Sequence, residues 1–394
     1  LHRPWKRALR TAGEGAILQD KLYTIGDGKM IYKDFQGTSL SRLGMGNMRL
    51  PEGRGGIDKE KAQAIIDYAM AQGINYYDTA YVYHHGESES FLGEALSKYP
   101  RESYYLATKF YVMANPNIEE MFEEQLKKLR TDYIDFYLLH CVNEETIGAY
   151  MDEKRHYIDF LLEQKAKGRI RHIGFSSHGK PETLKRFLEW SDAFAFVQIQ
   201  LNYLDWTMQD AKRQYALIAE RGLPVWVMEP VRGGRLASLG ERYDAMLKQA
   251  NPEWSVPAWA FHWLMGLPNV TMILSGMSSM EQIRDNIATF KEEAPLTAEQ
   301  NMLLMNIAAG YQSKQAVPCT ACRYCCDGCP QGIEIPRWMN LYNELSLTHD
   351  KAAWEQAVKE SPGPADCIGC GQCTAHCPQS IAIPEYMKKL CDFH

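Results

Sequence analysis

Cysteine is almost absent from the first three quarters of this chain: of eleven cysteines, Cys141 alone precedes Cys319. Long apolar runs are also absent, since no stretch reaches the roughly 20 residues that a membrane-spanning helix needs. The basic N-terminal residues are not followed by an apolar segment and a small-residue cleavage site, so we expect no secretory signal. These absences predict a cytoplasmic protein with no membrane partner.

Positive charge is not in excess either. The 394 residues carry a formal net charge of -6, which argues against a nucleic-acid partner. A content of 45% hydrophobic and 23% charged residues is typical of a soluble globular protein. The length exceeds that of one hydrophobic core, so two domains are expected.

The other ten cysteines lie in the last 76 residues, and eight of them form two copies of the pattern C-x2-C-x2-C-x3-C-P. The copies cover residues 319–330 and 367–378, and each is followed by I-x-I-P, which indicates an internal duplication. In a chain without a secretory signal, such clustering favours metal binding over disulfides. Three thiolates at intervals of three surround one corner of an iron-sulfur cube, and the fourth reaches the neighbouring cube.

The pattern therefore predicts two four-iron four-sulfur (4Fe-4S) clusters with crossed ligands. One cluster is assigned to Cys319, Cys322, Cys325 and Cys377, and the other to Cys367, Cys370, Cys373 and Cys329. Two structural zinc sites are the alternative, although zinc normally binds separated C-x2-C pairs. Cys326 and Cys391 fall outside the pattern and are expected to be bystanders. The motif resembles bacterial two-cluster ferredoxins, and the helical character of residues 337–360 makes an α-helical ferredoxin the closer likeness.

From residue 41 to residue 290, short β-rich runs alternate with amphipathic helical stretches, as in a parallel α/β sheet. Eight strands are expected, at residues 42–47, 74–80, 104–110, 133–140, 172–177, 196–202, 224–229 and 271–276. The clearest helices are expected at Lys59 to Gln72, Ile118 to Arg130, Pro181 to Trp190 and Gln209 to Arg221. Eight such units over about 250 residues favour a (β/α)8 TIM barrel. A doubly wound sheet is the alternative, but no G-x-G-x-x-G opens a helix.

A barrel of this kind carries its chemistry at the C-terminal ends of its strands. Asp78 and Tyr83 follow the second expected strand, Lys109 ends the third and His140 ends the fourth. Each residue has an ordinary structural alternative, namely a turn cap, a rim aromatic, a surface lysine and a core histidine. Because all four fall at adjacent strand ends, a catalytic group is the better interpretation.

The stretches GINYYDTAYVYHHGESE, ATKF and YLLHC carry these residues and resemble the aldo/keto reductases, a likeness that extends from about Ile31 to Phe290. The family implies hydride transfer between a nicotinamide and a carbonyl or alcohol substrate. Tyr83 would be the proton donor, Lys109 and Asp78 would tune it, and His140 would orient the carbonyl. A neighbouring ammonium favours phenolate, so we expect Lys109 to lower the pKa of Tyr83.

The resemblance also implies residues that bind the nicotinamide nucleotide. Ser176 and Gln198 would hold the carboxamide, Met228 would contact the nicotinamide ring, and Gly233 and Gly234 would approach the pyrophosphate. The adenosine side is assigned to Gly276, Gln282 and Asn286. Ser278 stands where many relatives place an arginine against the 2′-phosphate, so NADP(H) and NAD(H) both remain open.

The expected organisation is an extension or expression remnant at residues 1–29, the barrel at 30–295 and the iron-sulfur domain at 296–394. A helix over residues 292–312 is expected to pack between the domains. Hydride transfer does not use a cluster, so three hypotheses remain. In the first, the clusters exchange electrons with an external carrier or with the substrate pocket. In the second, the clusters are structural. In the third, the chain is a nicotinamide-binding redox sensor or electron-transfer module with little carbonyl turnover.

Overall fold

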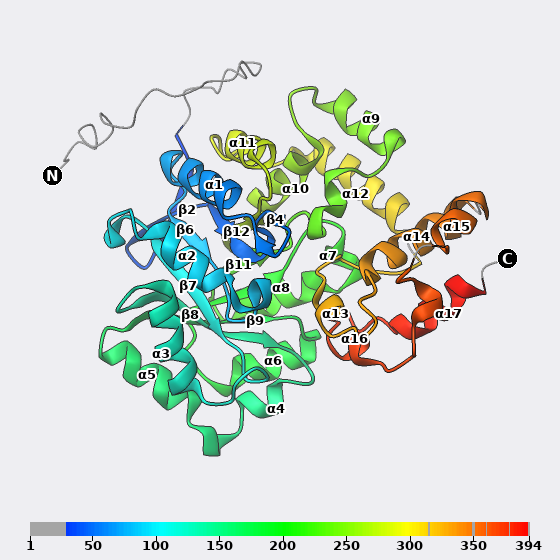
Figure 1. Ribbon diagram of the computed structural model, residues 1–394. Helices are drawn as coiled ribbons and strands as arrows, with labels where there is room; N and C mark the ends of the chain where they lie inside the picture. Colours follow the sequence, from blue (N-terminus) through cyan, green and yellow to red (C-terminus); the bar gives the residue numbers. More distant parts are fainter. Residues whose placement is uncertain (1–28, 314–315, 349–350, 360, 378, 393–394) are drawn as a thin grey trace.

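The structure is a computed structural model that describes residues 29–313, 316–348, 351–359, 361–377 and 379–392. Apart from Lys29, the extension expected at residues 1–29 lies outside the described residues. Figure 1 shows a barrel with a group of helices, coloured orange to red, on one side of it. Within the described residues, no helix combines the length and apolarity required to cross a membrane.

Eight parallel strands form the barrel: β3 (Leu43–Gly46), β6 (Tyr76–Asp78), β7 (Tyr105–Phe110), β8 (Ile134–Val142), β9 (Ile170–Ser177), β10 (Phe196–Gln200), β11 (Val225–Met228) and β12 (Val270–Gly276). They follow one another around the barrel in chain order, and β12 pairs with β3 to close it. Each strand coincides with one of the eight expected runs. The prediction of a (β/α)8 barrel is therefore confirmed.

Eight helices alternate with these strands: α1 (Lys59–Ala71), α2 (Ser88–Leu96), α3 (Ile118–Leu129), α5 (Tyr157–Ala166), α6 (Pro181–Trp190), α8 (Ala211–Glu220), α10 (Val256–Met265) and α11 (Met280–Thr289). Helix α3 illustrates why they form where they do. The Asn117 side chain accepts a hydrogen bond from the Glu120 backbone at its start, and Arg130 takes the left-handed conformation that ends it. Its apolar face, which includes Met121 and Phe122, is buried.

A hairpin of β1 (Tyr32–Phe35) and β2 (Thr38–Ser41) closes the end of the barrel remote from the C-terminal ends of the strands. Phe35 inserts among the aromatic side chains inside the barrel, with its ring centroid 4.9 Å from that of Trp226 and 5.8 Å from that of Phe136. Because side chains fill this end, the open end of the barrel is the one where the strands terminate.

The connections of the barrel contain further elements: η1 (Asn47–Arg49), β4 (Glu52–Gly53), β5 (Gly56–Ile57), η2 (Tyr83–Gly86), η3 (Arg101–Ser103), α4 (Ile147–Tyr150), η4 (Glu153–Arg155), α7 (Asp205–Met208), η5 (Arg232–Ala237) and α9 (Glu241–Ala250). Helix α12 (Ala298–Gln312) begins with a reciprocal capping box between Thr297 and Gln300. Its buried residues Leu304 and Ile307 belong to the barrel's hydrophobic cluster.

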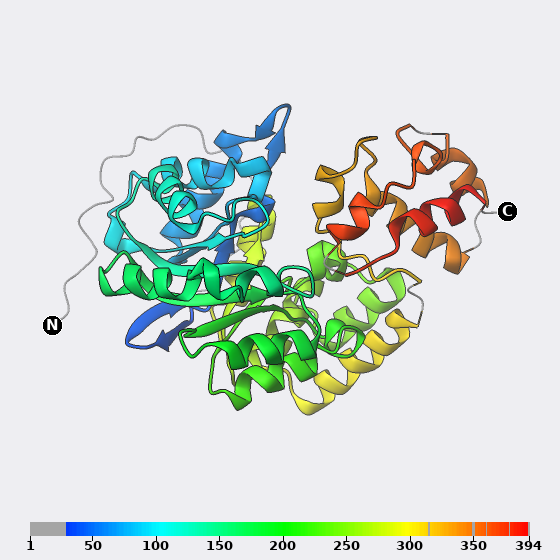
Figure 2. The same ribbon diagram turned by 90° about the horizontal axis from the view of Figure 1, so that it is seen from below.

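The C-terminal part contains α13 (Tyr324–Asp327), α14 (Ile335–Thr348), α15 (Lys351–Ala357), η6 (Pro364–Asp366), α16 (Gln372–Ala375) and α17 (Ile383–Cys391). It has a hydrophobic cluster of its own, which includes Trp338, Met339 and Leu390. The prediction of a mainly helical ferredoxin-like domain is confirmed. Figure 2 shows this domain and the barrel as two bodies that meet along one side.

Candidate active site and metal centres

The four expected catalytic residues come together at the open end of the barrel. Asp78 is the last residue of β6, Lys109 lies near the end of β7, and His140 lies near the end of β8. Tyr83 begins η2, the turn that follows β6. Neighbouring parallel strands end at the same rim, which is why residues distant in sequence meet here.

Lys109 is the centre of this group and is fully buried. Its Nζ donates to Asp78 Oδ1 and to the Thr79 carbonyl, both at 2.6 Å, and to the Tyr83 hydroxyl at 3.4 Å. Burial works to lower the pKa of Lys109, but the carboxylate of Asp78 and the neighbouring Tyr83 outweigh it, and the pKa lies above its ordinary value. Lys109 is therefore an ammonium group beside the Tyr83 oxygen.

Lys109 works to lower the pKa of Tyr83, as expected, but burial raises this pKa by more, and the pKa stays above the ordinary value for tyrosine. Burial has the larger effect because withdrawal from water costs the phenolate more than the ammonium returns. Tyr83 is thus a neutral phenol with a proton to donate.

His140 packs edge-to-face against Tyr83, with ring centroids 5.8 Å apart. Burial and the nearby Lys109 hold the pKa of His140 well below its usual range. Its Nδ1 has no hydrogen-bond partner among the described residues. A neutral imidazole and a neutral phenol therefore lie side by side at the barrel mouth.

The turn that presents Tyr83 is strained. His84 and His85 both take positive φ angles, of 50° and 53°, in the left-handed region that such residues seldom occupy. His84 is held there because the Leu50 backbone N–H donates to its Nε2 at 3.2 Å and its Nδ1 lies 3.0 Å from Glu52 Oε1. These contacts bend the chain back so that Tyr83 points into the barrel.

A cavity opens beside Tyr83. Its walls are Gly46, Met48, Arg49, Asp78, Tyr83, His178, Gln198, Gln200, Met228, Glu229, Leu274 and Gly276 from the barrel, and Thr320, Cys322, Tyr324 and Gln379 from the C-terminal domain. Four buried oxygens of this lining, on Asp78, Gln198, Glu229 and Thr320, have no hydrogen-bond partner among the described residues. Unpaired buried polar atoms favour a polar ligand in this cavity.

The residues assigned to the nicotinamide end are partly brought together. Gln198 and Met228 both line the cavity, and Gln198 Nε2 lies 3.7 Å from the Met228 sulfur. Ser176 is not in the cavity wall, because its hydroxyl accepts a hydrogen bond from the Cys141 backbone at 2.9 Å. Of the two carboxamide candidates, Gln198 alone faces the cavity.

Two of the residues assigned to the adenosine side make hydrogen bonds within the barrel. Asn286 donates to the Ser275 hydroxyl at 3.0 Å, and Gln282 accepts from the Ser278 backbone at 2.7 Å. Gly276 does line the cavity, but a Cβ at this position would stand 3.0 Å from the Cβ of Arg49. The Arg49 side chain therefore covers this glycine.

Of the glycine pair after β11, Gly233 lies against the C-terminal domain. A Cβ on Gly233 would stand 2.0 Å from the Thr320 carbonyl oxygen, whereas one on Gly234 would meet nothing within 4 Å. The close approach that Gly233 permits is therefore to the backbone of the C-terminal domain.

Sequence reasoning missed the residues that attach the C-terminal domain to the barrel. Arg232 is fully buried, pairs with Asp205 at 3.0 Å and donates to the Pro318 carbonyl at 3.0 Å. Gln200 also donates to Asp205, at 2.7 Å, and accepts from Gln379 at 3.1 Å. The sequence indicates this attachment only indirectly. Pro318 and Gln379, which accept and donate these hydrogen bonds, lie within two residues of the motif cysteines Cys319 and Cys377.

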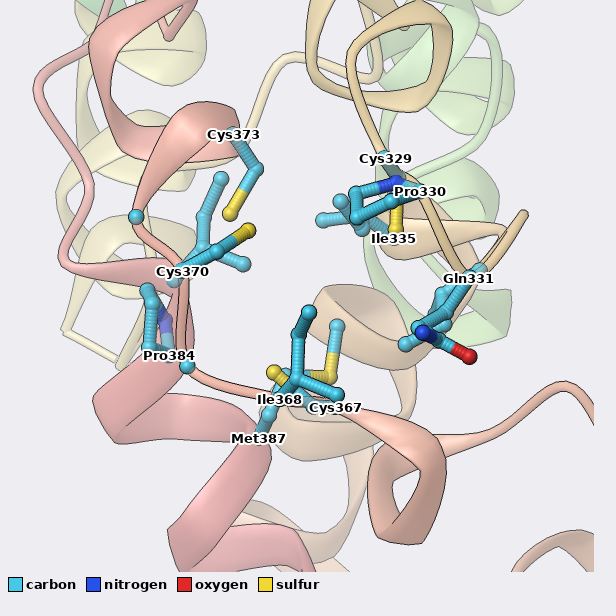
Figure 3. Close-up of a pocket in the computed structure, with 14 residues that line it drawn as sticks. Cys329, Pro330, Gln331, Ile335, Cys367, Ile368, Cys370, Cys373, Pro384 and Met387 are labelled. Carbon is cyan, nitrogen blue, oxygen red and sulfur yellow. The ribbon is translucent and has the colours of Figure 1, made fainter.

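The eight motif cysteines surround two cavities in the C-terminal domain. Cys319, Cys322, Cys325 and Cys377 line one of them, which we call the first cysteine site. Cys329, Cys367, Cys370 and Cys373 line the other, which we call the second cysteine site. In Figure 3, Cys370 and Cys373 approach the second site from one side and Cys329 from the other. These are the two sets of the crossed assignment.

Cys326 and Cys391 line neither cavity, although Cys326 directly follows Cys325. Among the described residues, no three His, Cys, Asp or Glu side chains converge closely enough to hold a single metal ion. Each cavity is lined by four motif thiols, three from one copy of the motif and one from the other, a donor set that fits an iron-sulfur cube.

Comparison with known proteins agrees with this architecture. Residues 42–308 match the aldo/keto reductase family, and residues 318–382 match a 4Fe-4S dicluster domain. The chain therefore belongs to the aldo/keto reductase family and is an oxidoreductase of that type, with a ferredoxin-type 4Fe-4S domain at its C-terminus.

Similar proteins match the barrel portion of the chain. An uncharacterized oxidoreductase of Bacillus subtilis (strain 168), YqkF, is 29% identical over 63% of this chain and 86% of its own length. The NADH-specific methylglyoxal reductase of Escherichia coli (strain K12) is 26% identical over 64% of this chain and 90% of its own length. An aldo-keto reductase structure from Bacillus halodurans in its holo form is 28% identical, with a TM-score of 0.57 over 71% of this chain and 96% of that one.

Proposed function

We propose that the protein interconverts a small-molecule carbonyl and its alcohol, with NAD(H) or NADP(H) as the hydride carrier. The observation that carries this proposal is the contact of the Lys109 ammonium with both Asp78, at 2.6 Å, and the Tyr83 hydroxyl, at 3.4 Å. A phenol supported in this way is suited to general acid catalysis on a carbonyl oxygen.

The chain's own residues would act as follows. Tyr83 and His140 direct hydrogen-bond donors to the carbonyl oxygen, where negative charge develops during reduction. Tyr83 transfers its proton to that oxygen and becomes a phenolate, which the Lys109 ammonium stabilises. Asp78 keeps Lys109 charged and in position, because a buried ammonium without a carboxylate would tend to lose its proton.

The nicotinamide, when bound, supplies or receives the hydride. Gln198 would hold its carboxamide, since the unpaired Gln198 oxygen faces the cavity. Met228 would contact the ring, and its sulfur is suited to packing against a flat heteroaromatic face. The pyrophosphate and adenosine groups would need Arg49 to move from Gly276, because its side chain lies against that glycine.

For the C-terminal domain, we propose that each cysteine site holds one 4Fe-4S cluster. The first site adjoins the active-site cavity, because Thr320, Cys322 and Gln379 line both. At the second site Cys370 is exposed and Ile368 is 64% exposed. This arrangement favours electron transfer between the cavity and an external electron carrier, with the second site as the point of contact.

The first experiment replaces Tyr83 by Phe in anaerobically purified protein, with methylglyoxal as the probe carbonyl and NADPH or NADH as the donor. Turnover should fall by about 10²- to 10⁴-fold while the nucleotide dissociation constant stays within twofold. Tyr81→Phe is the matched control, because the Tyr81 hydroxyl bonds Glu124 at 3.0 Å and does not line the cavity. Full turnover by Tyr83→Phe would refute the proposal.

A second experiment tests electron transfer. NADPH or NADH is added to the anaerobic protein without a carbonyl, and the visible absorption of the clusters is followed. Bleaching supports electron exchange between nicotinamide and iron. Unchanged absorption contradicts that exchange and leaves the clusters to structure or to an external carrier.

A further inference from the structure

Tyr324 belongs to the iron-sulfur motif but faces the barrel. It stands between Cys322 and Cys325, two cysteines of the first cysteine site, at the start of α13. Its side chain does not line that site, and it lines the active-site cavity together with Tyr83. The loop that carries the cysteines thus also contributes a phenol to the cavity.

The Tyr324 hydroxyl and the Tyr83 hydroxyl belong to side chains that line the same cavity. Tyr324 works to lower the pKa of Tyr83 against the larger effect of burial, and its hydroxyl lies 3.8 Å from the Met48 sulfur of the barrel. The Tyr83 hydroxyl therefore has Lys109 from β7 at 3.4 Å and Tyr324 from the C-terminal domain as polar neighbours. A carbonyl that approaches Tyr83 has to fit beside the Tyr324 ring.

The position of Tyr324 is held from several sides. Arg49 of the barrel donates to the Ala321 carbonyl at 3.3 Å, and Arg232 donates to the Pro318 carbonyl at 3.0 Å. These bonds fix the start of the loop on the barrel, and the two flanking cysteines would fix Tyr324 once the first cysteine site is filled.

We propose that Tyr324 is an active-site residue supplied by the C-terminal domain, with two separable roles. Its hydroxyl positions the Tyr83 hydroxyl for proton transfer, and its ring limits the size of the carbonyl compound that reaches Tyr83. The inference rests on the proposed carbonyl chemistry. It assigns the iron-sulfur domain a direct part in substrate selection, whether or not electrons pass through it.

The second copy of the motif provides a matched control. Gln372 stands between Cys370 and Cys373, in the place that Tyr324 has in the first copy, and it does not line the active-site cavity. Gln372→Ala therefore alters the same loop position without altering the barrel. Tyr324→Phe removes only the hydroxyl, and Tyr324→Ala removes the ring as well.

The test compares full-length, cluster-loaded proteins with methylglyoxal as a small carbonyl and 4-nitrobenzaldehyde as a bulky one. Tyr324→Phe should lower kcat about tenfold for both, with KM within twofold, because the proposed hydrogen bond to the reacting group cannot form. Tyr324→Ala should show the same tenfold fall in kcat. It should also raise the ratio of kcat/KM for the bulky carbonyl to kcat/KM for the small one by at least fivefold. Gln372→Ala should match the parent protein.

A binding measurement gives a result independent of turnover. Benzoate and acetate are non-reacting anions that accept hydrogen bonds from the donors at Tyr83 and His140. Tyr324→Ala should bind benzoate at least fivefold more tightly relative to acetate, and Tyr324→Phe should keep the parent ratio. Iron content confirms that all variants are loaded equally.

The proposal is overturned if both Tyr324 variants keep the parent kcat, size preference and benzoate-to-acetate ratio within twofold. It is also overturned if Gln372→Ala produces the same changes, since the effect would then come from the loops in general. Failure of the proposed function looks different, because Tyr83→Phe would then be as active as the parent.

Discussion

The Thr320 carbonyl oxygen of the C-terminal domain lies 2.0 Å from the point where a Cβ on Gly233 of the barrel would stand. Gly233 also has a φ of +64°, which other residues adopt only with strain. Gly233 therefore matters at the contact between the domains for two reasons. Its missing side chain permits the close approach of Thr320, and its backbone conformation shapes the loop after β11.

Gly233→Ala is expected to weaken the docking of the C-terminal domain. Gly234→Ala is its control, because Gly234 has a φ of +93° but nothing within 4 Å of its Cβ position. Both variants should lose about 1–2 kcal/mol of stability from left-handed strain. Gly233→Ala should lose about 1–3 kcal/mol more from the clash. Chemical unfolding and the rate of limited proteolysis measure the difference, and equal losses would contradict the contact.

The crossed cysteine assignment predicts which clusters each variant loses. Cys377→Ser should remove the cluster shared with Cys319, and Cys329→Ser should remove the cluster shared with Cys367. Each variant should retain about half of the iron, because one of two cubes remains. Iron analysis and EPR after reduction would show two different residual spectra.

Cys326→Ser is the control for these variants, because Cys326 is next to Cys325 in sequence but lines neither cavity. It should retain all of the iron. If Cys326→Ser lost a cluster and Cys325→Ser did not, the assignment of the first cysteine site would be wrong.

Lys109→Met is expected to cost about 3–5 kcal/mol of folding free energy. The substitution leaves the carboxylate of Asp78 buried without a counter-charge, since Asp78 is only 3% exposed. The double variant Asp78→Asn, Lys109→Met should regain part of this loss because the uncompensated charge is gone. Urea unfolding of the four proteins in a double-mutant cycle measures the coupling, and strictly additive losses would contradict a buried pair.

Buried histidines are expected to make the protein sensitive to mild acid. Burial, with a smaller contribution from Lys109, lowers the pKa of His178 to about 4, and burial lowers the pKa of His262 to about 4. An unfolded histidine binds a proton near pH 6.5, so below that pH the unfolded state holds more protons than the native state. Stability is therefore fully present above pH 6.5 and falls as the pH drops toward 4.

Buried His262 should contribute at most about 1.4 kcal/mol of this loss per pH unit, and half-buried His178 should contribute less. Urea unfolding at pH 7.5, 6.5 and 5.5 gives the slope, and His262→Gln should reduce it. Equal unfolding free energies at pH 7.5 and 5.5 would show that these histidines are protonated in the native state.

Much of the barrel and its catalytic group could be predicted from the sequence. Each strand is a short β-rich run with its own turn signals, so the pattern is local and readable. Asp78, Lys109 and His140 could be placed together because the ends of adjacent parallel strands share one rim. The nucleotide-binding residues stay a prediction, and the bonds that Ser176, Gln282 and Asn286 make within the barrel could not be read from residue types.

The sequence by itself determined the eight strands, the proposed catalytic residues at the strand ends and the two cysteine motifs, because each depends on local periodicity, strand ends or ligand spacing. Only the tertiary structure decided that the first cysteine site adjoins the cavity beside Tyr83 and that Tyr324 lines this cavity with Tyr83. Those relationships arise from complementary surfaces about 240 residues apart in sequence (324 minus 83). Such surfaces depend on loop conformations and buried contacts, including that of Gly233 with Thr320, which appear only when the two domains are packed together.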